Sequence, residues 1–445
     1  MQAPGSRSPA RQGERPRLVV IGNGMAATRT LDELLAIAPD HYRITLLGRE
    51  PGPAYNRILL SPLLAGEIEL EQIRLHDRDW YHQQGIELLT GTGYQVTRID
   101  RHRCRVQCAN GQQIHYDRLL IATGSLPALP ELEGLSPGGN PLKGVLGFRD
   151  LADVEQMTQA ARAGNEAVVI GGGLLGLEAA HGLNCLGMRV TLVHRAPYLL
   201  NRQLDPEAAA LLQRELESRG IRFVLAGRSR AVRHHTDADG ADKVAALELE
   251  DGQRLAADLL VVTTGIRPNI ELAAACGLAC RQGVLVNDCL QTYDPRIYAV
   301  GECVEHRGLT FGLVEPLFQQ ARVCANQLAG IGTGRYRFTP PPTRLKVSGI
   351  QLFSLGELEP AATDSPPQAL VYRDPAGGIY RKLLLRDNRL VGAVLYGEVA
   401  DGPWYFELMR TGQDLSALRA QLIFGQACCE RLQRTRPPVT AEEAA

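Results

Sequence analysis

The chain has 445 residues, and a prior of roughly 150 residues per domain suggests about three domains. Its 48 lysines and arginines nearly balance its 49 aspartates and glutamates, which gives a formal net charge of -1. This balance creates no global field that would recruit nucleic acid or an anionic membrane. The apolar runs are far shorter than the roughly 20 residues of a membrane-spanning helix, so we expect a protein that neither binds nucleic acid nor enters a membrane.

The first 15 residues contain three arginines but no apolar segment behind them, which argues against a secretory signal and predicts a disordered tail. Ten cysteines are scattered along the chain. Without a signal, they are expected to remain thiols in a reducing compartment. We therefore expect a cytoplasmic protein.

A repeated pattern of strands and helices begins at residue 17. RLVVIG predicts a strand, residues 25–37 a helix and RITLLG a second strand. EAVVIGGG, a helix over residues 174–186 and RVTLVHR repeat this order. Because a βαβ unit of this kind holds one dinucleotide, the repeat indicates two bound dinucleotides.

The first repeat contains Gly22-x-Gly24-x-x-Ala27 between its strand and its helix. Small residues let the backbone turn tightly there, so that the helix N-terminus can face a pyrophosphate. The second strand ends in Arg49-Glu50, where Glu50 can bind ribose hydroxyls and Arg49 can lie along the adenosine. An ordinary glycine turn is the alternative. The candidate residues of this repeat are Gly22, Gly24, Met25, Ala26, Ala27, Arg49 and Glu50.

The second repeat carries the full GxGxxG spacing in GGGLLG. Its second strand ends in His194-Arg195 instead of an acid, and these groups can accept a 2′-phosphate, so NADPH is favoured over NADH. The alternative is that His194 only caps the strand and Arg195 is a solvated surface charge. The candidate residues are Gly171, Gly173, Leu174, Leu175, Gly176, His194 and Arg195.

Three further segments each predict a strand that runs into a glycine turn: LLIATGS at 119–125, VVTTGIRPN at 261–269 and DPRIYAVGEC at 294–303. Together with the two repeats, they resemble the pyridine-nucleotide-dependent flavoprotein reductases, which include glutathione, ferredoxin and rubredoxin reductases. The resemblance covers residues 17–335. It implies an α/β fold with two Rossmann-like domains, like that of glutathione reductase, in which the NAD(P) domain is inserted into the FAD domain.

The expected organisation follows from this resemblance and from the change in composition after residue 335. It comprises an FAD domain over 17–142 and 268–336, an NAD(P) domain over 143–267, a small α+β C-terminal domain over 341–427, and disordered tails over 1–15 and 433–445. TPPPT at 339–343 predicts a stiff linker. In the C-terminal domain we expect a β meander around the turn Asp387-Asn388 and a helical tail from Trp404 to about Leu422.

The same resemblance assigns roles at the two sites. Ala122, Thr123 and Gly124 close the first part of the FAD domain, and Thr264 and Gly265 close the NAD(P) domain. After Gly301, Glu302 takes the place of an acid, commonly Asp in the family, that binds the ribityl chain of the flavin. The helix N-terminus at Val314, Glu315 and Pro316 would face the pyrimidine end of the flavin, with a plain amphipathic helix as the alternative. Glu178 would lie near the nicotinamide carboxamide, or would only be a charge at a helix start.

A narrower resemblance depends on PAYNRILLSPLLAGE, GGGLLGLEAAHGL, NRQLD and QTYDPRIYAVGEC. These segments resemble the flavin module of assimilatory NAD(P)H nitrite reductase large subunits and the electron-transfer subunit of assimilatory nitrate reductase. The stretch IYRKLLLRDNRLVGAVLYGE resembles the small domain that follows that module. By this resemblance, Tyr55, Asn56 and Arg57 lie along the FAD.

Missing motifs narrow the subclass. No Cys-x-x-Cys pair occurs, so reduction of a disulfide is not expected. Leu60-Ser61-Pro62 has proline where peroxide-reducing relatives carry a cysteine, which excludes a sulfenic-acid cycle at that position. Cys104 and Cys108 are expected on one face of a single strand, as ordinary thiols. No metal site is indicated, because Cys428 and Cys429 alone cannot ligate an iron–sulfur cluster.

The sequence therefore predicts an FAD-dependent NAD(P)H oxidoreductase. Because iron–sulfur and sirohaem segments are missing, we expect a separate redox protein as acceptor. The narrower resemblance implies that this acceptor is the nitrite or nitrate reductase of nitrogen assimilation. A rubredoxin or ferredoxin reductase is the alternative enzyme, and a redox-sensing interaction protein is the alternative of another class. A homodimer is left open.

Overall fold

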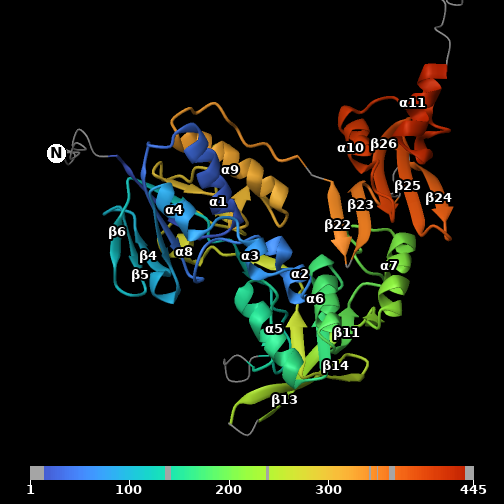
Figure 1. Ribbon diagram of the computed structural model, residues 1–445, viewed down its shortest axis with the longest axis horizontal. Coiled ribbons are helices and arrows are strands. Elements are labelled where there is room, and N and C mark those ends of the chain that lie inside the picture. The colour runs from blue at the N-terminus through green and yellow to red at the C-terminus, as the bar shows by residue number, and fades with distance from the viewer. Residues whose placement is uncertain are drawn as a thin grey trace, which may run out of the picture. The chain divides into compact units, whose positions relative to one another are not determined.

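The computed structural model describes residues 15–135, 142–236, 240–339, 342–347, 349–359 and 366–435 (Figure 1). It forms two compact units. Unit 1 comprises residues 1–63, 67–128 and 265–339, and unit 2 comprises residues 64–66, 129–264 and 340–445. Most of each predicted tail, residues 1–14 and 436–445, lies outside the described residues, whereas a helix extends to Thr435.

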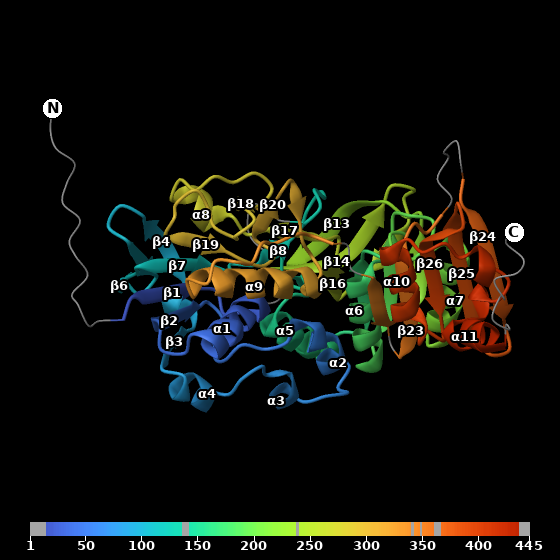
Figure 2. The ribbon, with the colours of Figure 1, turned by 90° about the horizontal axis from the view of Figure 1, so that it is seen from above.

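Unit 1 is organised around a parallel sheet with the strand order β19-β7-β1-β2-β3. The central strand β1 (Arg17–Ile21) is apolar and buried beyond its first residue, as expected for a strand covered on both faces. Helix α1 (Met25–Ile37) has the predicted bounds and packs beside α9 (Val314–Leu328), as Figures 1 and 2 show. The other strands of the sheet are β2 (Arg43–Gly48), β3 (Ile86–Thr90), β7 (Arg118–Ile121) and β19 (Ile297–Ala299).

Shorter elements complete unit 1. Its antiparallel sheet consists of β4 (Val96–Asp100), β5 (Arg105–Cys108) and β6 (Gln113–His115). Two further small sheets are formed by β8 (Ser125–Pro127) with β17 (Ile266–Pro268), and by β18 (Val284–Leu285), β20 (Val304–His306) and β21 (Leu309–Thr310). The short helices are α2 (Leu60–Leu64, whose last residue belongs to unit 2), α3 (Leu70–Ile73), α4 (Arg78–Gln83) and α8 (Glu271–Ala275), with single turns at Arg57–Leu59 and Thr92–Tyr94.

The predicted placement of Cys104 and Cys108 on one strand is wrong. Cys104 lies in the turn between β4 and β5 and has a φ of 49°, a left-handed conformation that ends strand pairing. The carboxylate of Asp100 accepts the Arg103 N–H at 3.0 Å and so stabilises this turn. All ten cysteines lie in the described ranges, and each is a free thiol.

Unit 2 repeats this architecture over residues 129–264. Its parallel sheet has the order β12-β11-β10-β16-β9 and carries an antiparallel sheet β13-β14-β15. This repeat confirms the predicted pair of Rossmann-like folds. The strands are β9 (Val145–Leu146), β10 (Glu166–Ile170), β11 (Arg189–His194), β12 (Arg222–Leu225), β13 (Ser229–Thr236), β14 (Asp242–Leu249), β15 (Arg254–Ala256) and β16 (Leu259–Val262), and the helices are α5 (Leu151–Ala163), α6 (Leu174–Cys185) and α7 (Pro206–Ser218).

The C-terminal segment of unit 2 is an antiparallel sheet with the order β22-β23-β26-β25-β24. The predicted turn joins β25 and β26, where Asp387 and Asn388 have φ values of 48° and 56°, as a tight hairpin turn requires. The predicted single helical tail is wrong, because Gly412 with a φ of 61° ends its first helix. The elements are β22 (Thr343–Val347), β23 (Ile350–Gly356), β24 (Gln368–Asp374), β25 (Ile379–Arg386), β26 (Arg389–Tyr396), α10 (Gly402–Thr411), single turns at Ser416–Leu418 and Leu422–Phe424, and α11 (Gln426–Thr435).

Within the part of the chain that the structure describes, no helix has both the length and the apolar composition needed to cross a bilayer.

Candidate functional site

The glycine turn of unit 1 brings two predicted segments together. Gly22 has a φ of 106°, and a Cβ atom there would lie 2.1 Å from the carbonyl oxygen of Ala122. The Gly22 N–H donates to the Leu47 carbonyl at 2.8 Å. Only glycine therefore fits where the turn after β1 meets the segment after β7, and Thr123 and Gly124 follow directly on that segment.

The outer side of this turn is open. Gly24 precedes α1 without any side-chain cap, and no atom lies within 4 Å of a Cβ built on it. The first N–H groups of α1, including those of Met25 and Ala26, carry the partial positive charge of the helix start, and Gly24 has no side chain that could accept from them. Asn23 donates from Nδ2 to the Gly52 carbonyl at 3.1 Å, but its buried Oδ1 has no hydrogen-bond partner among the described residues. The free space at Gly24 fits the pyrophosphate of FAD, and the unpaired Oδ1 of Asn23 fits a hydroxyl group of FAD as its donor.

The predicted residues Glu50 and Arg57 form one cluster. The Tyr55 hydroxyl donates to Oε2 of Glu50 at 2.5 Å, and the Arg57 guanidinium binds the other carboxylate oxygen. Arg57 also donates to the Tyr55 hydroxyl at 3.0 Å and lies over its ring. Asn56 is used differently, because its Oδ1 accepts the Ile58 N–H at 3.0 Å. The cluster holds Glu50 close to the end of β2, where ribose recognition is expected.

A second turn of unit 1 contains Gly301 and Glu302. The Gly301 N–H donates to Oε1 of the buried Gln320 on α9 at 2.8 Å, and a Cβ on Gly301 would lie 3.1 Å from the Ala26 side chain. Glu302 accepts a hydrogen bond from the Ser125 hydroxyl at 2.8 Å. This turn therefore lies against the start of α1. Residues Val314, Glu315 and Pro316 begin α9, which also has no side-chain cap.

Cys303 directly follows this turn and is fully buried. Burial raises the pKa of its thiol, so the protein keeps it protonated near neutral pH. It therefore has no thiolate character for a sulfur-based redox cycle.

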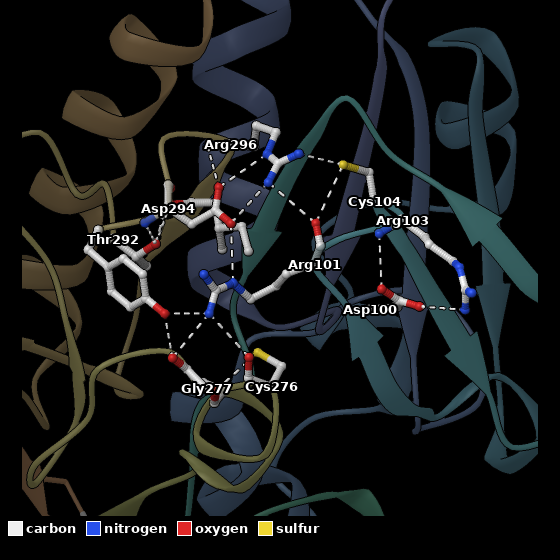
Figure 3. A network of polar contacts seen from close by, with 12 residues as sticks. Asp100, Arg101, Arg103, Cys104, Cys276, Gly277, Thr292, Asp294 and Arg296 are labelled. Atoms are coloured by element: carbon white, nitrogen blue, oxygen red, sulfur yellow. Dashed lines mark hydrogen bonds and ion pairs between the residues drawn. The ribbon is translucent and has the colours of Figure 1, made fainter. Parts of the chain in front are cut away.

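The segment that leads into Gly301 is anchored by an arginine and aspartate network (Figure 3). The buried Asp294 contacts Nε of Arg101 and Nε of Arg296, each at 3.2 Å. Burial disfavours its charge, yet the hydrogen bonds from the two guanidinium groups hold the pKa of Asp294 below its ordinary value. Arg296 also reaches the Cys104 sulfur at 2.8 Å. The network ties the turn after β4 to the start of β19.

The glycine turn of unit 2 is built in the same way. Gly171 has a φ of 118° and faces the Thr263 carbonyl, which a Cβ would approach to 2.6 Å. A Cβ on Gly176 would lie 1.9 Å from the Gly171 carbonyl oxygen. The Thr263 hydroxyl donates to the Ile170 carbonyl at 2.9 Å, directly before Thr264 and Gly265. These contacts bring α6 close against the turn and the end of β16.

The start of α6 is open in the manner of α1. Gly173 precedes the helix with no side-chain cap, and no atom lies within 4 Å of a Cβ built on it. The half-buried residues Leu174 and Leu175 form the first turn, and Glu178 lies half-buried one turn further on. This geometry again fits the pyrophosphate of a dinucleotide, here NAD(P).

The ring of His194 is hydrogen-bonded to the glycine turn. The Gly172 N–H donates to its Nδ1 at 3.1 Å, and its Nε2 lies 3.3 Å from Oδ1 of Asn201. Nδ1 must then be an acceptor, and burial lowers the pKa of the ring, so His194 is neutral at pH 7. Arg195 is exposed at the end of β11. At the end of β11, the positive charge is therefore on Arg195 and not on His194.

Predicted residues thus meet at a glycine turn in each unit: Gly22 meets Ala122 in unit 1, and Gly171 meets Gly176 in unit 2. Sequence reasoning missed five side chains that contact predicted residues or adjoin their glycine turns: Asn23, Ser125, Asn201, Thr263 and Gln320. Asn23 and Thr263 adjoin predicted glycine turns, so proximity could have indicated them. Nothing in the local spacing indicates Gln320, since it contacts Gly301 across 19 residues.

Comparison with known proteins supports this architecture. Residues 16–327 match the model of the pyridine nucleotide-disulphide oxidoreductase family, and residues 341–413 match that of the rubredoxin NAD+ reductase C-terminal domain. A covalent complex of putidaredoxin reductase with putidaredoxin contains a similar structure, with a TM-score of 0.76 and 29% identity over 90% of this chain and 94% of that chain.

Two curated relatives come from Bacillus subtilis. The chain is 42% identical to nitrite reductase [NAD(P)H] over 90% of its own length and 48% of the relative. It is 38% identical to the assimilatory nitrate reductase electron transfer subunit over 92% of its own length and 51% of the relative. The chain therefore spans about half the length of these relatives.

Proposed function

The chain belongs to the pyridine nucleotide-disulphide oxidoreductase family, whose members bind FAD and NAD(P)H, and from this premise we propose that it transfers electrons from NAD(P)H to a separate protein acceptor. Bound FAD supplies the chemistry, since it accepts two electrons as hydride and releases them singly. One observation carries the proposal: both units contain an open glycine turn followed by a helix without a side-chain cap. Two such turns in one chain provide one pyrophosphate site for NAD(P)H, the electron donor, and one for the bound FAD.

In this proposal, unit 1 holds FAD. The turn at Gly22 and Gly24 binds its pyrophosphate, and Glu50 with Arg57 lies at its adenosine side. Glu302 and the start of α9 lie at its flavin side. The residues assigned to FAD are Gly22, Gly24, Met25, Ala26, Ala27, Arg49, Glu50, Asn56, Arg57, Ala122, Thr123, Gly124, Gly301, Glu302, Val314, Glu315 and Pro316.

The residues assigned to NAD(P)H are Gly171, Gly173, Leu174, Leu175, Gly176, Thr264 and Gly265, all in unit 2 except Gly265, which begins the last segment of unit 1. Glu178 orients the nicotinamide through a hydrogen bond to its carboxamide. Orientation and proximity are what hydride transfer mainly requires, so no general base is assigned. We further propose a preference for NADPH that comes from the exposed guanidinium of Arg195.

The proposed acceptor is the catalytic part of a nitrite or nitrate reductase. The support is the similarity to nitrite reductase [NAD(P)H] and to a nitrate reductase electron transfer subunit. The chain contains no Cys-x-x-Cys pair, and burial raises the pKa of the Cys303 thiol, so the proposal passes electrons from FAD to the acceptor without a disulfide intermediate.

The test is anaerobic stopped-flow mixing of the FAD-loaded protein with NADH or NADPH, followed by a second mixing with acceptor. We expect the flavin absorbance to bleach, faster with NADPH. It should return on mixing with a nitrite or nitrate reductase catalytic subunit. Failure to bleach with either nucleotide would refute the reductase proposal.

The second candidate is a rubredoxin reductase, which the match of residues 341–413 to the rubredoxin NAD+ reductase C-terminal domain favours. This function would be supported if the flavin absorbance returned on mixing with rubredoxin but not with the nitrite or nitrate reductase subunit. Bleaching without fast turnover on any acceptor, including ferricyanide, would instead indicate a redox-sensing protein.

A further inference from the structure

The loop between β11 and α7, residues 195–205, contains Arg195 and is held at both ends by the C-terminal segment of unit 2. We propose that this segment is a clamp on the nucleotide-binding loop and thereby sets the affinity for the dinucleotide. The inference rests on the proposed function of unit 2 and deepens it by giving the C-terminal sheet a role. The clamp is defined by four contacts: Tyr198 with Glu359, Asp205 with Tyr380, Asp205 with Lys382, and Glu207 with Arg373.

The loop is coupled to the glycine turn. The Leu200 N–H donates to the Gly172 carbonyl at 2.9 Å, while the Gly172 N–H donates to His194. Asn201 contacts the other side of the His194 ring. A movement of the loop therefore displaces the turn on which the pyrophosphate would lie.

The conformation of the loop needs external support. Leu200 has a φ of 49°, a left-handed conformation that a leucine rarely adopts. Its side chain is fully buried, together with those of Leu199 and Leu204. Strain of this kind persists only where surrounding contacts over-determine it, and the clamp contacts lie on both sides of Leu200 in sequence.

Asp205 is the strongest contact of the clamp. Its side chain is 2% exposed, and its Oδ1 caps α7 by accepting the Ala208 N–H at 3.2 Å. Its Oδ2 accepts the Tyr380 hydroxyl at 2.6 Å and the Lys382 ammonium at 2.9 Å. Tyr380 and Lys382 are two residues apart on β25, so their side chains point to the same side of the sheet. Because a buried carboxylate without partners is strongly destabilising, the loop end and β25 are held together.

Two contacts at the surface extend the clamp. The Tyr198 hydroxyl donates to Glu359 at 3.1 Å, next to the start of the loop. Arg373 on β24 binds both carboxylate oxygens of Glu207 in the first turn of α7, one of them at 2.8 Å. A bidentate pair is directional, so it also restricts the orientation of α7 against the sheet.

The test compares Asp205→Asn, Tyr380→Phe and Lys382→Met with the wild-type holoprotein. Asparagine still caps a helix, so Asp205→Asn removes the charge from the clamp and keeps the cap. The matched control is Arg410→Met, which breaks the Arg410–Glu407 ion pair within α10 of the same C-terminal segment, where neither partner takes part in a clamp contact. We expect the Kd for NADP+ and the KM for NADPH to rise about 3- to 30-fold in the clamp variants. The kcat with ferricyanide and the FAD content should stay unchanged, and the control should bind like wild type.

An effect of equal size in the control, or a fall in kcat with unchanged KM, would overturn the clamp. If Asp205→Asn does not fold, Tyr198→Phe supplies the same comparison, with hydrogen exchange of the 195–205 amides as readout. If the wild-type protein binds NADP+ but NADPH does not bleach its flavin, the proposed function is refuted. The clamp is then still tested by the Kd values of the variants for NADP+. A wild-type protein that binds neither NADP+ nor NAD+ would refute both.

Discussion

Replacing Gly176 with alanine tests the close contact between α6 and the glycine turn of unit 2. The new methyl group would lie 1.9 Å from the Gly171 carbonyl oxygen and 2.7 Å from the Thr263 hydroxyl oxygen. Since nonbonded atoms rest about 3.5 Å apart, the helix has to recede by roughly 1.5 Å. The obstructing atom at 1.9 Å belongs to the backbone, so no side-chain rotation relieves the overlap.

Overpacking of this kind costs about 1–3 kcal/mol, and the better helix propensity of alanine offsets up to about 1 kcal/mol. We expect unit 2 to lose about 1–2 kcal/mol of unfolding free energy, which lowers its Tm by roughly 2–8 °C. The displaced helix start should also weaken NADP+ binding, because a shift of about 1 Å can cost on the order of 100-fold in a positioned site.

The assay uses the two tryptophans of the chain, Trp80 in unit 1 and Trp404 in unit 2. In a Trp80→Phe background, the fluorescence of Trp404 reports the unfolding of unit 2 alone. The matched control is Gly173→Ala, whose methyl group meets no atom within 4 Å and which should weaken NADP+ binding without loss of stability. Equal unfolding midpoints for Gly176→Ala and Gly173→Ala would refute the packing argument.

Three further predictions concern individual side chains. Arg195→Ala should lower kcat/KM for NADPH about 10- to 100-fold and leave that for NADH nearly unchanged, and an unchanged ratio would remove Arg195 from phosphate binding. Burial lowers the pKa of His194 from 6.5, so the stability contributed by its neutral ring is present above pH 6.5 and is lost as the pH falls through the folded pKa. His194→Asn should therefore weaken the decline in unfolding free energy below about pH 6.5, as measured by urea titration, and an identical pH profile would contradict the assignment. Gln320→Leu leaves the Gly301 N–H unpaired and should cost about 1–3 kcal/mol, with a higher Kd for FAD, whereas full FAD retention would argue against this positioning role.

The elements that could be predicted are those encoded by local spacing. The helix over residues 25–37 has its predicted bounds, and both glycine turns adopt the positive φ that their spacing implies. The hairpin at Asp387 and Asn388 likewise follows from two residues that tolerate a left-handed conformation. In each case the physical cause lies within a few neighbouring residues, so the sequence carries enough information.

The parts that could not be predicted depend on contacts between distant residues. Cys104 fits the apolar alternation of a strand, but Asp100 and Arg296 hold it in a turn. The bond between Asp205 and Tyr380 spans 175 residues, and no local pattern marks either partner. The division into two units also depends on such contacts, and the predicted domain boundaries at 142, 267 and 341 stay predictions.

His194 shows how burial changes the chemistry inferred from a residue type. Next to Arg195, a histidine suggests a doubly basic site for a phosphate, yet its Nδ1 is used by the Gly172 N–H and its pKa is lowered. Under the proposed preference for NADPH, the 2′-phosphate is recognised by the exposed guanidinium of Arg195, at the start of the loop whose other end Asp205 holds against the C-terminal sheet. The preference between NADPH and NADH should therefore change in clamp variants that are remote from Arg195, because they alter where its charge lies. Clamp variants that weaken both nucleotides equally would instead show that the loop positions the glycine turn and not the guanidinium.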